Sequence, residues 1–158
     1  GIFKEKQVEL VGCVKTCQVV PEVPLAHESD WDMEYNDLKL SIKIVDSFSE
    51  AVKFINRHGS GHTDVIITEN LERAEQFLNE VSSSSVMWNA STRFADGFRY
   101  GLGAEIGIST NRTHARGPVG LEGLIIYKYK LYGNGQVAGD YSGAKAREFT
   151  HKPLTPSM

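Results

Sequence analysis

The sequence predicts an α/β fold with parallel strands, and three observations support this class. Apolar residues alternate with polar residues from 38 to 44, which is the period of a half-buried strand. Two later segments, 47–58 and 70–81, start with capping residues and carry apolar side chains at helical spacing. Strand-like and helical segments also alternate along the chain, and parallel strands need such a crossover between them.

A strand and a capped helix open this pattern. The strand is defined by alternating apolar residues, which are Leu38, Leu40, Ile42 and Ile44. Ser47 is a good N-cap, and Glu50 stands three residues later in the position of a capping box. We expect the helix to end at His58 and Gly59. Its apolar positions are Phe48, Ala51, Val52 and Ile55.

A second strand and helix follow. Residues 65–67 are a short apolar run that predicts a buried strand. Asn70 is expected to cap the next helix. The predicted apolar stripe of this helix is Leu71, Ala74, Leu78 and Val81. Four serines at 82–85 connect it to a third predicted strand at 86–88.

The remainder predicts a loop, a strand and a tail. Residues 89–120 are rich in glycine and polar residues, so we expect a long irregular loop, and such loops are usually functional or disordered. Residues 124–132 predict a strand that ends at a turn signal, Gly133 to Gly135. In that strand apolar side chains alternate with lysines, in the order Tyr127, Lys128, Tyr129, Lys130 and Leu131. Residues 137–158 lack periodicity and include Pro153 and Pro156, so we expect a loosely ordered tail.

The composition is that of an ordinary globular protein and excludes several partners. The chain is 41% hydrophobic and 23% charged, with a formal net charge of −3. Nucleic acids and anionic membrane surfaces attract a clustered excess of Lys and Arg, so we expect neither partner. No apolar stretch approaches the roughly 20 residues of a membrane span. The two cysteines, Cys13 and Cys17, give little support to a redox or metal protein, so we expect no metal site.

Three sequence blocks carry a family resemblance. Residues 56–64 read Asn-Arg-His-Gly-Ser-Gly-His-Thr-Asp, and residues 89–97 read Asn-Ala-Ser-Thr-Arg-Phe-Ala-Asp-Gly. The third block joins Gly-Leu-Gly-Ala-Glu-Ile-Gly-Ile-Ser-Thr at 101–110 to His-Ala-Arg-Gly-Pro-Val-Gly-Leu-Glu-Gly-Leu at 114–124. From about residue 31 to about residue 136, the chain resembles the γ-glutamyl phosphate reductases, or glutamate-5-semialdehyde dehydrogenases, of the aldehyde dehydrogenase superfamily. Its tail is more similar to the reductase portion of eukaryotic pyrroline-5-carboxylate synthases than to short bacterial enzymes.

The resemblance implies the C-terminal portion of an aldehyde-dehydrogenase-like catalytic domain plus an oligomerisation strand. The implied reaction is the NADPH-dependent reduction of L-glutamyl 5-phosphate to L-glutamate 5-semialdehyde in proline biosynthesis. In the family a cysteine thiolate attacks the acyl phosphate, phosphate leaves, and hydride reduces the thioester. That cysteine precedes Asn-Ala and lies upstream of the matched region, as does the cofactor domain, whereas neither Cys13 nor Cys17 precedes Asn-Ala. We therefore expect no catalytic residue here and no turnover by this chain alone.

The resemblance also implies a set of substrate-binding residues. They are Asn89, Ser91, Thr92, Arg93, Phe94, His114 and Arg116. Arg93 suits a doubly anionic ligand, because a guanidinium group can hold a carboxylate or a phosphate with two parallel hydrogen bonds. Alternatively, Arg93 pairs with Asp96 and braces the loop. His62 is either a polar contact or a structural residue, and a structural role for His114 and Arg116 is an equal alternative.

Glu34 is the cofactor-binding candidate. It aligns with a glutamate that hydrogen-bonds a cofactor ribose in the wider superfamily, and the alternative is a solvated surface acid. Asn36, two residues later, stands where the family usually has Leu.

The resemblance divides the chain into three parts. They are an N-terminal segment whose order the sequence leaves open (1–30), a catalytic-domain portion (31–136) and the tail (137–158). Within the second part lie the substrate loop (89–120) and the terminal oligomerisation strand (124–132), which would add to the sheet of a partner subunit in a homo-oligomer. The competing hypothesis is a non-catalytic oligomerisation or interaction module. The implied location is cytoplasmic or mitochondrial.

Overall fold

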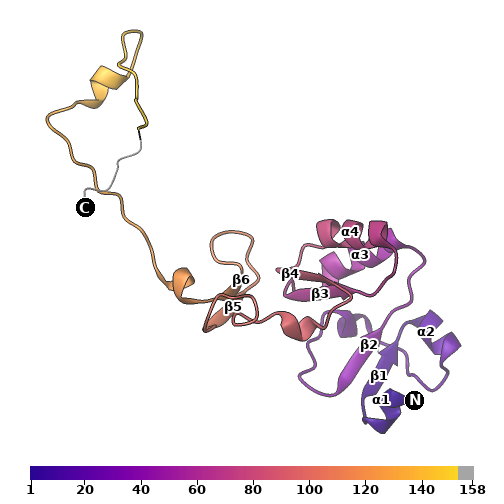
Figure 1. Ribbon diagram of the computed structural model, residues 1–158. Helices are drawn as coiled ribbons and strands as arrows, with labels where there is room; N and C mark the ends of the chain where they lie inside the picture. Colours follow the sequence, from indigo (N-terminus) through magenta and orange to yellow (C-terminus); the bar gives the residue numbers. More distant parts are fainter. Residues whose placement is uncertain (153–158) are drawn as a thin grey trace. The chain divides into compact units, whose positions relative to one another are not determined.

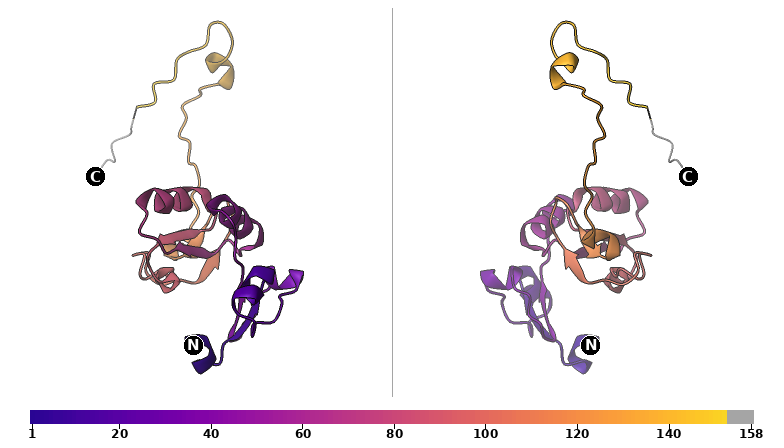
Figure 2. Two further views of the ribbon diagram at one scale, coloured as in Figure 1. Left: turned by 90° about the vertical axis from the view of Figure 1, so that its right-hand side faces the viewer. Right: turned by 90° about the vertical axis from the view of Figure 1, so that its left-hand side faces the viewer.

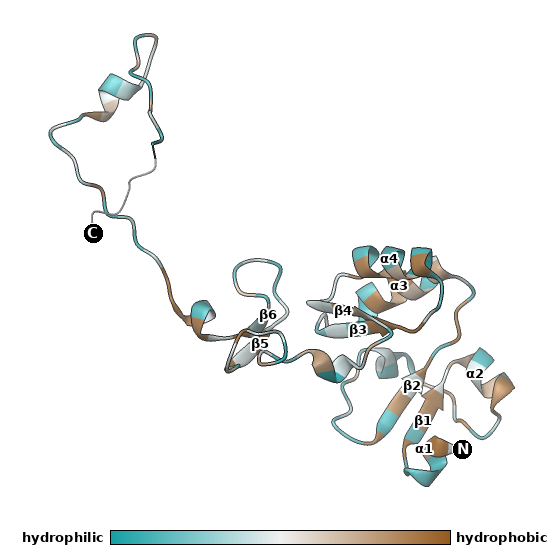
Figure 3. Cartoon of the chain, in the orientation of Figure 1, coloured by the Kyte–Doolittle hydropathy of each residue, from teal (hydrophilic) through white to brown (hydrophobic). Residues whose placement is uncertain are grey.

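The first sheet joins two parallel strands, one of which comes from the N-terminal segment. The structure is a computed structural model that describes residues 1–152 (Figure 1). Strand β1 (Glu9–Gly12) pairs in parallel with β2 (Lys39–Ile42), with Glu9 opposite Lys39. Three short helices surround this pair, and they are α1 (Ile2–Glu5), α2 (Val14–Val19) and the 3-10 helix η1 (Glu28–Trp31). Apolar and polar residues alternate along β2, as predicted (Figure 3).

The second sheet is a strand–helix–strand unit. Strand β3 (Thr63–Ile66) pairs in parallel with β4 (Ser85–Trp88) through the crossover helix α4 (Leu71–Glu80). Helix α3 (Phe48–His58) precedes β3, and α3 and α4 lie on the same side of the two strands (Figures 1 and 2). The predicted order of elements is confirmed here. The chain nevertheless forms two separate parallel pairs in the described residues, because β2 and β3 are not paired.

The predicted helix caps are present. The Ser47 side chain accepts a hydrogen bond from the Glu50 N–H at 3.1 Å, and the Asn70 side chain accepts one from the Arg73 N–H at 2.9 Å. The Glu50 carboxylate accepts the Asp46 N–H at 2.9 Å, one residue before the position that a capping box would use. Gly59 follows the last residue of α3, as predicted.

The core lies between the two helices and the second sheet. Its buried members are Val52, Phe77 and Val81, with Phe48, Ile55, Ile66 and Val86 packed against them. The predicted stripe of α4 is wrong at its first residue, because Leu71 is 58% exposed and Phe77 is 4% exposed. The series 74, 77 and 81 has helical spacing as good as the predicted one, so periodicity alone does not select the buried face.

The loop at 89–120 contains more regular structure than predicted. It forms the 3-10 helix η2 (Thr92–Phe94) and a small antiparallel hairpin of β5 (Gly107–Ser109) and β6 (Gly117–Val119). Strands of three residues are too short to produce a readable alternation in sequence. The glycines here permit a left-handed backbone, as at Gly101 with φ of 77°.

The segment after the hairpin lacks the predicted strand. Leu121–Leu124 form the 3-10 helix η3, and residues 125–132 adopt no regular structure. A strand requires a hydrogen-bonding neighbour, and none lies beside this segment in the part of the chain that the structure describes. The chain divides into two compact units, Gly1–Ile125 and Ile126–Met158, and the second contains the 3-10 helix η4 (Ala138–Tyr141). Pro153 and Pro156 lie outside the described residues.

Candidate functional site

A surface pocket of about 640 Å³ in the first unit gathers residues from four segments. One wall is Glu34, and a second is the turn that leads into β3. The third is the loop around η2, and the fourth is the end of β5. The lining residues are Glu34, Ser60, His62, Thr63, Thr92, Arg93, Ala95, Asp96, Arg99, Ile108 and Thr110. The structure thus brings together Glu34, Thr92 and Arg93 of the predicted set, together with His62.

Glu34 lies on a short segment that is fixed at both ends. The Tyr35 hydroxyl donates to the Asp30 carboxylate at 2.7 Å, and this bond lowers the pKa of Asp30 from its ordinary value. His58 of α3 contacts the Asp32 carboxylate through Nδ1 at 2.7 Å. Asn36 has φ of 51°, a conformation that Asn tolerates better than most residues, which accounts for its place in this turn. These bonds hold the residues on either side of Glu34, whose exposed side chain lines the pocket.

The turn before β3 is tied to the neighbouring strand. The His62 carbonyl accepts hydrogen bonds from the Ser84 hydroxyl at 2.6 Å and the Ser85 N–H at 2.9 Å. The Tyr100 hydroxyl donates to Ser85 Oγ at 2.9 Å. These bonds link the turn to the loop beyond η2 through β4, so two walls of the pocket share one network. The His62 imidazole contacts the Thr63 hydroxyl, which is consistent with its structural alternative.

The loop around η2 is closed by its own polar groups. The Ser91 hydroxyl accepts the Arg93 N–H at 3.3 Å and caps η2. The Asp96 carboxylate accepts the N–H groups of Phe98 at 2.8 Å and Arg99 at 3.2 Å. The Arg99 guanidinium donates to the Arg93 carbonyl. It also lies over the Phe94 ring, 5.9 Å from the ring centroid.

The two guanidinium groups of the pocket have no acidic partner. Among residues 1–152, no carboxylate lies within salt-bridge distance of Arg93 or Arg99. The alternative in which Arg93 pairs with Asp96 is therefore not formed. Both arginines are solvent-exposed, so their charges are available to an incoming anion. Hydroxyl groups of the lining add neutral donors beside them, which are Ser60, Thr63, Thr92 and Thr110.

Asn89, at the start of the loop, does not line this pocket. Its amide group accepts the Thr68 N–H at 2.9 Å and donates to the Thr68 carbonyl at 2.8 Å. The Trp88 indole also donates to that carbonyl at 2.8 Å. Asn89 has φ of 48°, so it serves as the point where β4 turns into the loop. A bracing role thus accounts for the Asn89 side chain in this chain.

His114 and Arg116 lie away from the same pocket. The Arg116 guanidinium donates to the Ser82 carbonyl and lines a different cavity of about 510 Å³ next to β6. His114 is exposed, with φ of 60°. The alternative in which Arg116 holds the loop to the core matches its contact with Ser82. Phe94 is exposed and contacts Arg99 instead of the pocket interior.

Sequence reasoning missed Arg99 as a pocket residue. It falls between two of the quoted blocks, in the stretch Phe98-Arg99-Tyr100, and no motif marks it. The only sequence feature that could have indicated it is its position six residues after Arg93, beyond Gly97. No group of three or more His, Cys, Asp or Glu side chains in residues 1–152 is arranged to hold a metal ion. No helix in that range is long and apolar enough to span a membrane.

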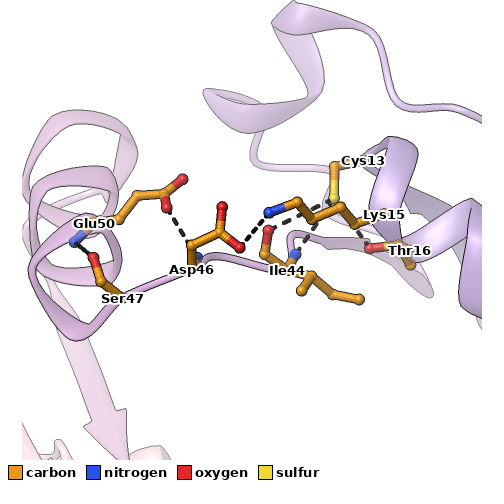
Figure 4. Close-up of polar contacts among 7 residues, drawn as sticks. All are labelled: Cys13, Lys15, Thr16, Ile44, Asp46, Ser47 and Glu50. Atoms are coloured by element: carbon orange, nitrogen blue, oxygen red, sulfur yellow. Dashed lines mark hydrogen bonds and ion pairs between the residues drawn. The ribbon is translucent and has the colours of Figure 1, made fainter.

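The cysteines lie outside the pocket, next to the first sheet. Figure 4 shows Cys13 at the start of α2, with its sulfur 3.3 Å from the Thr16 hydroxyl and 3.4 Å from the Ile44 nitrogen. Burial raises the pKa of Cys13, but hydrogen bonds from Thr16 and from backbone N–H groups outweigh it and bring the pKa to about 7. Lys15 pairs with Asp46 beside it (Figure 4). This thiol is ionisable, but it has no place among the pocket residues.

Comparison with known proteins identifies the class to which this fold belongs. Residues 40–103 match the sequence model of the Aldehyde dehydrogenase family. A crystal structure of gamma-glutamyl phosphate reductase from Thermotoga maritima superposes with a TM-score of 0.78 at 47% identity, covering 85% of this chain and 33% of that one. The predicted fold class, a portion of an aldehyde-dehydrogenase-like α/β domain, is confirmed.

The chain is also similar in sequence to gamma-glutamyl phosphate reductases. It is 57% identical to the enzyme of that name from Pelotomaculum thermopropionicum over 149 residues, which is 94% of this chain and 34% of the relative. It is 65% identical to the one from Methanococcoides burtonii over 133 residues, which is 84% of this chain and 30% of the relative. The chain therefore spans about a third of the length of the relatives it matches.

Proposed function

We propose that this chain supplies the substrate-anchoring part of a reductase that converts L-glutamyl 5-phosphate to L-glutamate 5-semialdehyde with NADPH. The observation that carries the proposal is the pocket in which Arg93, Thr92 and Glu34 converge, with the arginine unpaired. The substrate bears a carboxylate at one end and a phosphate at the other, so it needs fixed cations. The names of the relatives, each at more than 50% identity, support this choice of substrate.

The pocket residues would act by binding and orientation. Arg93 would hold an anionic group of the substrate through paired N–H donors, while the Thr92 hydroxyl adds a neutral donor. Glu34 is exposed and borders the same pocket, so its carboxylate could accept hydrogen bonds from the ribose hydroxyls of the cofactor. NADPH, when bound, supplies the hydride. The substrate anchor and the cofactor contact would then face one another across a single cavity.

The nucleophile would come from the other two thirds of the enzyme. Neither Cys13 nor Cys17 lines the pocket, and neither has the sequence context of the family's nucleophile. The chain alone would therefore bind but not turn over. The bacterial and archaeal origin of the relatives favours the cytoplasm as the location.

A second candidate function, oligomerisation, is favoured by the segment 126–132. Its apolar side chains are nearly fully exposed, with Ile126 and Leu131 each at 96% and Tyr129 at 89%. Such a row of aromatic and aliphatic groups favours pairing with another chain. We propose that it adds to the sheet of a second copy. Sedimentation should then show self-association that Tyr129→Lys with Leu131→Lys weakens, and a monomeric parent chain would contradict this role.

The test of the reductase is reconstitution. Joining this chain to the region of the Pelotomaculum thermopropionicum relative that precedes the matched residues should give NADPH-dependent reduction of L-glutamyl 5-phosphate, followed at the absorbance of NADPH. Arg93→Ala should raise KM roughly 10- to 100-fold, the range expected for one charged hydrogen-bonding partner. Arg73→Ala is the matched control, because Arg73 lies on α4 and hydrogen-bonds Gln76. Unchanged kinetics in Arg93→Ala would remove the assignment.

A further inference from the structure

We infer that Arg99 is a second anion-binding residue of the pocket, which together with Arg93 forms a two-arginine clamp for an oxyanion group of the ligand. The inference deepens the proposed function and rests on the same pocket. It names a residue outside the seven substrate-binding residues that the family resemblance implied. Its basis is the position and pairing of the Arg99 side chain.

The side chain of Arg99 is preorganised at the pocket. Its backbone N–H is held by Asp96 at 3.2 Å, and its guanidinium donates to the Arg93 carbonyl. The Arg99 Cζ atom also lies over the Phe94 ring, 5.9 Å from its centroid. A guanidinium group has five N–H donors in a fixed fork, so most of its donors stay free after the single bond to Arg93. Because its rotamer is already restricted, less conformational entropy is lost when it binds an anion.

The acids of the pocket also leave the guanidinium group of Arg99 free to meet an anion. Neither guanidinium group is paired with a carboxylate in the described residues. The Asp96 carboxylate, which is the nearest acidic group in sequence, is occupied by two backbone N–H groups. Glu34 is the other acid of the lining. The two acids balance the two arginines in formal charge, but neither acid pairs with a guanidinium group, so N–H donors of both arginines stay open to an oxyanion at one concave surface.

The chemistry that fits is an oxyanion with several acceptor atoms. A planar fork binds the oxygens of a carboxylate or a phosphate in pairs, and two forks from one loop can surround a single group. The substrate of the proposed reaction offers both kinds of oxyanion. Inorganic phosphate and L-glutamate each carry one of them, so separate titrations distinguish which end of the substrate Arg99 contacts.

The experiment is an anion titration of the 158-residue chain, followed by NMR with ¹⁵N labelling. Inorganic phosphate or L-glutamate should give saturable shifts at the amides of Thr92, Arg93 and Thr110. Arg99→Gln should weaken the binding of at least one of the two anions roughly tenfold. Arg73→Gln, with the same loss of charge on α4, should leave both affinities unchanged. Wild-type affinity in Arg99→Gln, or no saturable binding by the parent chain, would overturn the inference.

Arg99→Lys separates anion binding from a purely structural role. Lysine keeps the charge and can donate to the Arg93 carbonyl, but it lacks the planar fork. If Arg99 binds the anion directly, Arg99→Lys should lose roughly threefold in affinity while the amide shifts of Asp96 and Phe98 stay as in the parent. If Arg99 only braces the loop, Arg99→Lys should bind as the parent does, and the inference is then wrong. This variant also serves if Arg99→Gln unfolds the loop.

A failure of the two-arginine clamp can be distinguished from a failure of the proposed function by combining the anion titrations with the activity of the reconstituted enzyme. Loss of phosphate or glutamate binding in Arg99→Gln, combined with an inactive reconstituted enzyme, would leave the clamp in place and reject the proposed reaction. An active reconstituted enzyme whose KM does not change with Arg99→Gln, together with unchanged anion binding, would reject the clamp alone.

Discussion

The loop around η2 and the segment 126–132 are both almost free of regular structure, yet they differ in how their polar groups are satisfied. The loop is closed by the Ser91 cap, the Asp96 carboxylate and the Tyr100 contact with Ser85. The backbone of 126–132 makes no backbone hydrogen bond in the described part of the chain. Two segments without regular secondary structure can therefore differ widely in how many of their polar groups are hydrogen-bonded. An irregular segment whose backbone donors and acceptors are hydrogen-bonded can hold the residues of a site in place.

The largest expected effect contrasts the packed core of the first unit with the exposed segment 126–132. Phe77→Ala removes the largest buried side chain between α4 and the second sheet, where Phe77 is 4% exposed. We expect a loss of about 3–5 kcal/mol in the free energy of unfolding. Tyr129→Ala, in the exposed segment, should change it by less than about 0.5 kcal/mol. Chemical denaturation followed by circular dichroism measures both, and similar losses would show that 126–132 is packed in solution.

A close backbone approach gives the next largest effect. A Cβ atom added at Gly120 would lie 2.7 Å from the Leu102 carbonyl oxygen, so Gly120→Ala must displace the hairpin backbone. We expect about 1–3 kcal/mol of destabilisation from this overpacking. Gly133→Ala is the control outside the first unit, because its nearest neighbour is the flexible Gln136 side chain at 3.4 Å. Its effect should stay below about 0.5 kcal/mol. Equal melting temperatures for the two variants would contradict the close approach.

The helix cap at Asn70 should have a smaller effect. Asn70→Ala removes the acceptor of the Arg73 N–H and should lower stability by about 1 kcal/mol. Asn70→Asp keeps an oxygen in the same position and places a negative charge at the start of α4, so it should retain most of the parent stability. Thermal unfolding of the two variants tests the cap. A loss in Asn70→Asp as large as that in Asn70→Ala would point to a different role for this side chain.

The last expected effect is the pH response of Cys13. Its pKa is about 7 in the folded chain, below the ordinary value of 9.0, so the folded state favours the thiolate. The resulting stabilisation is fully present above pH 9 and is lost as the pH falls through 7. Alkylation of Cys13 by iodoacetamide should therefore reach half its maximal rate near pH 7 in the folded chain. In urea, the midpoint should move to about pH 8.5–9.

Cys17→Ser isolates this titration, and Cys13→Ser should abolish it. A midpoint above pH 8 in the folded Cys17→Ser chain would mean that the hydrogen bonds from Thr16 and Ile44 do not stabilise the thiolate. The mutation Thr16→Val removes one donor and should raise the midpoint, because a hydrogen bond to the charged form lowers its pKa.

The sequence predicted the strand–helix–strand order because each element carries a local signal. Ser47 and Asn70 are caps, and residues 38–44 alternate at the period of a strand. The partner of β2 was not predicted, since β1 is only four residues long and the sequence of 1–30 gives no clear period. The separation into two sheets is likewise a property of tertiary packing, which no local pattern encodes.

The sequence named candidate site residues, and the structure shows where each of them lies. Glu34, Thr92 and Arg93 line one pocket, but their roles toward cofactor and substrate stay predictions. Asn89 and Arg116 instead contact the backbone at Thr68 and Ser82, and only coordinates can distinguish such a brace from a ligand contact. Arg99 was not predicted, because no sequence motif includes it and its place in the pocket depends on how the loop folds.

Two hydrogen bonds attach the loop to its surroundings. The Tyr100 hydroxyl donates to Ser85, and the Gly97 N–H donates to the Glu105 carboxylate at 2.8 Å. Neither pair lines the pocket, so the loop is fastened by residues that a ligand would not meet. Side chains at 92 and 93 could then be exchanged while the fastening is retained. A library randomised at those positions would sample new ligand preferences on an unchanged framework.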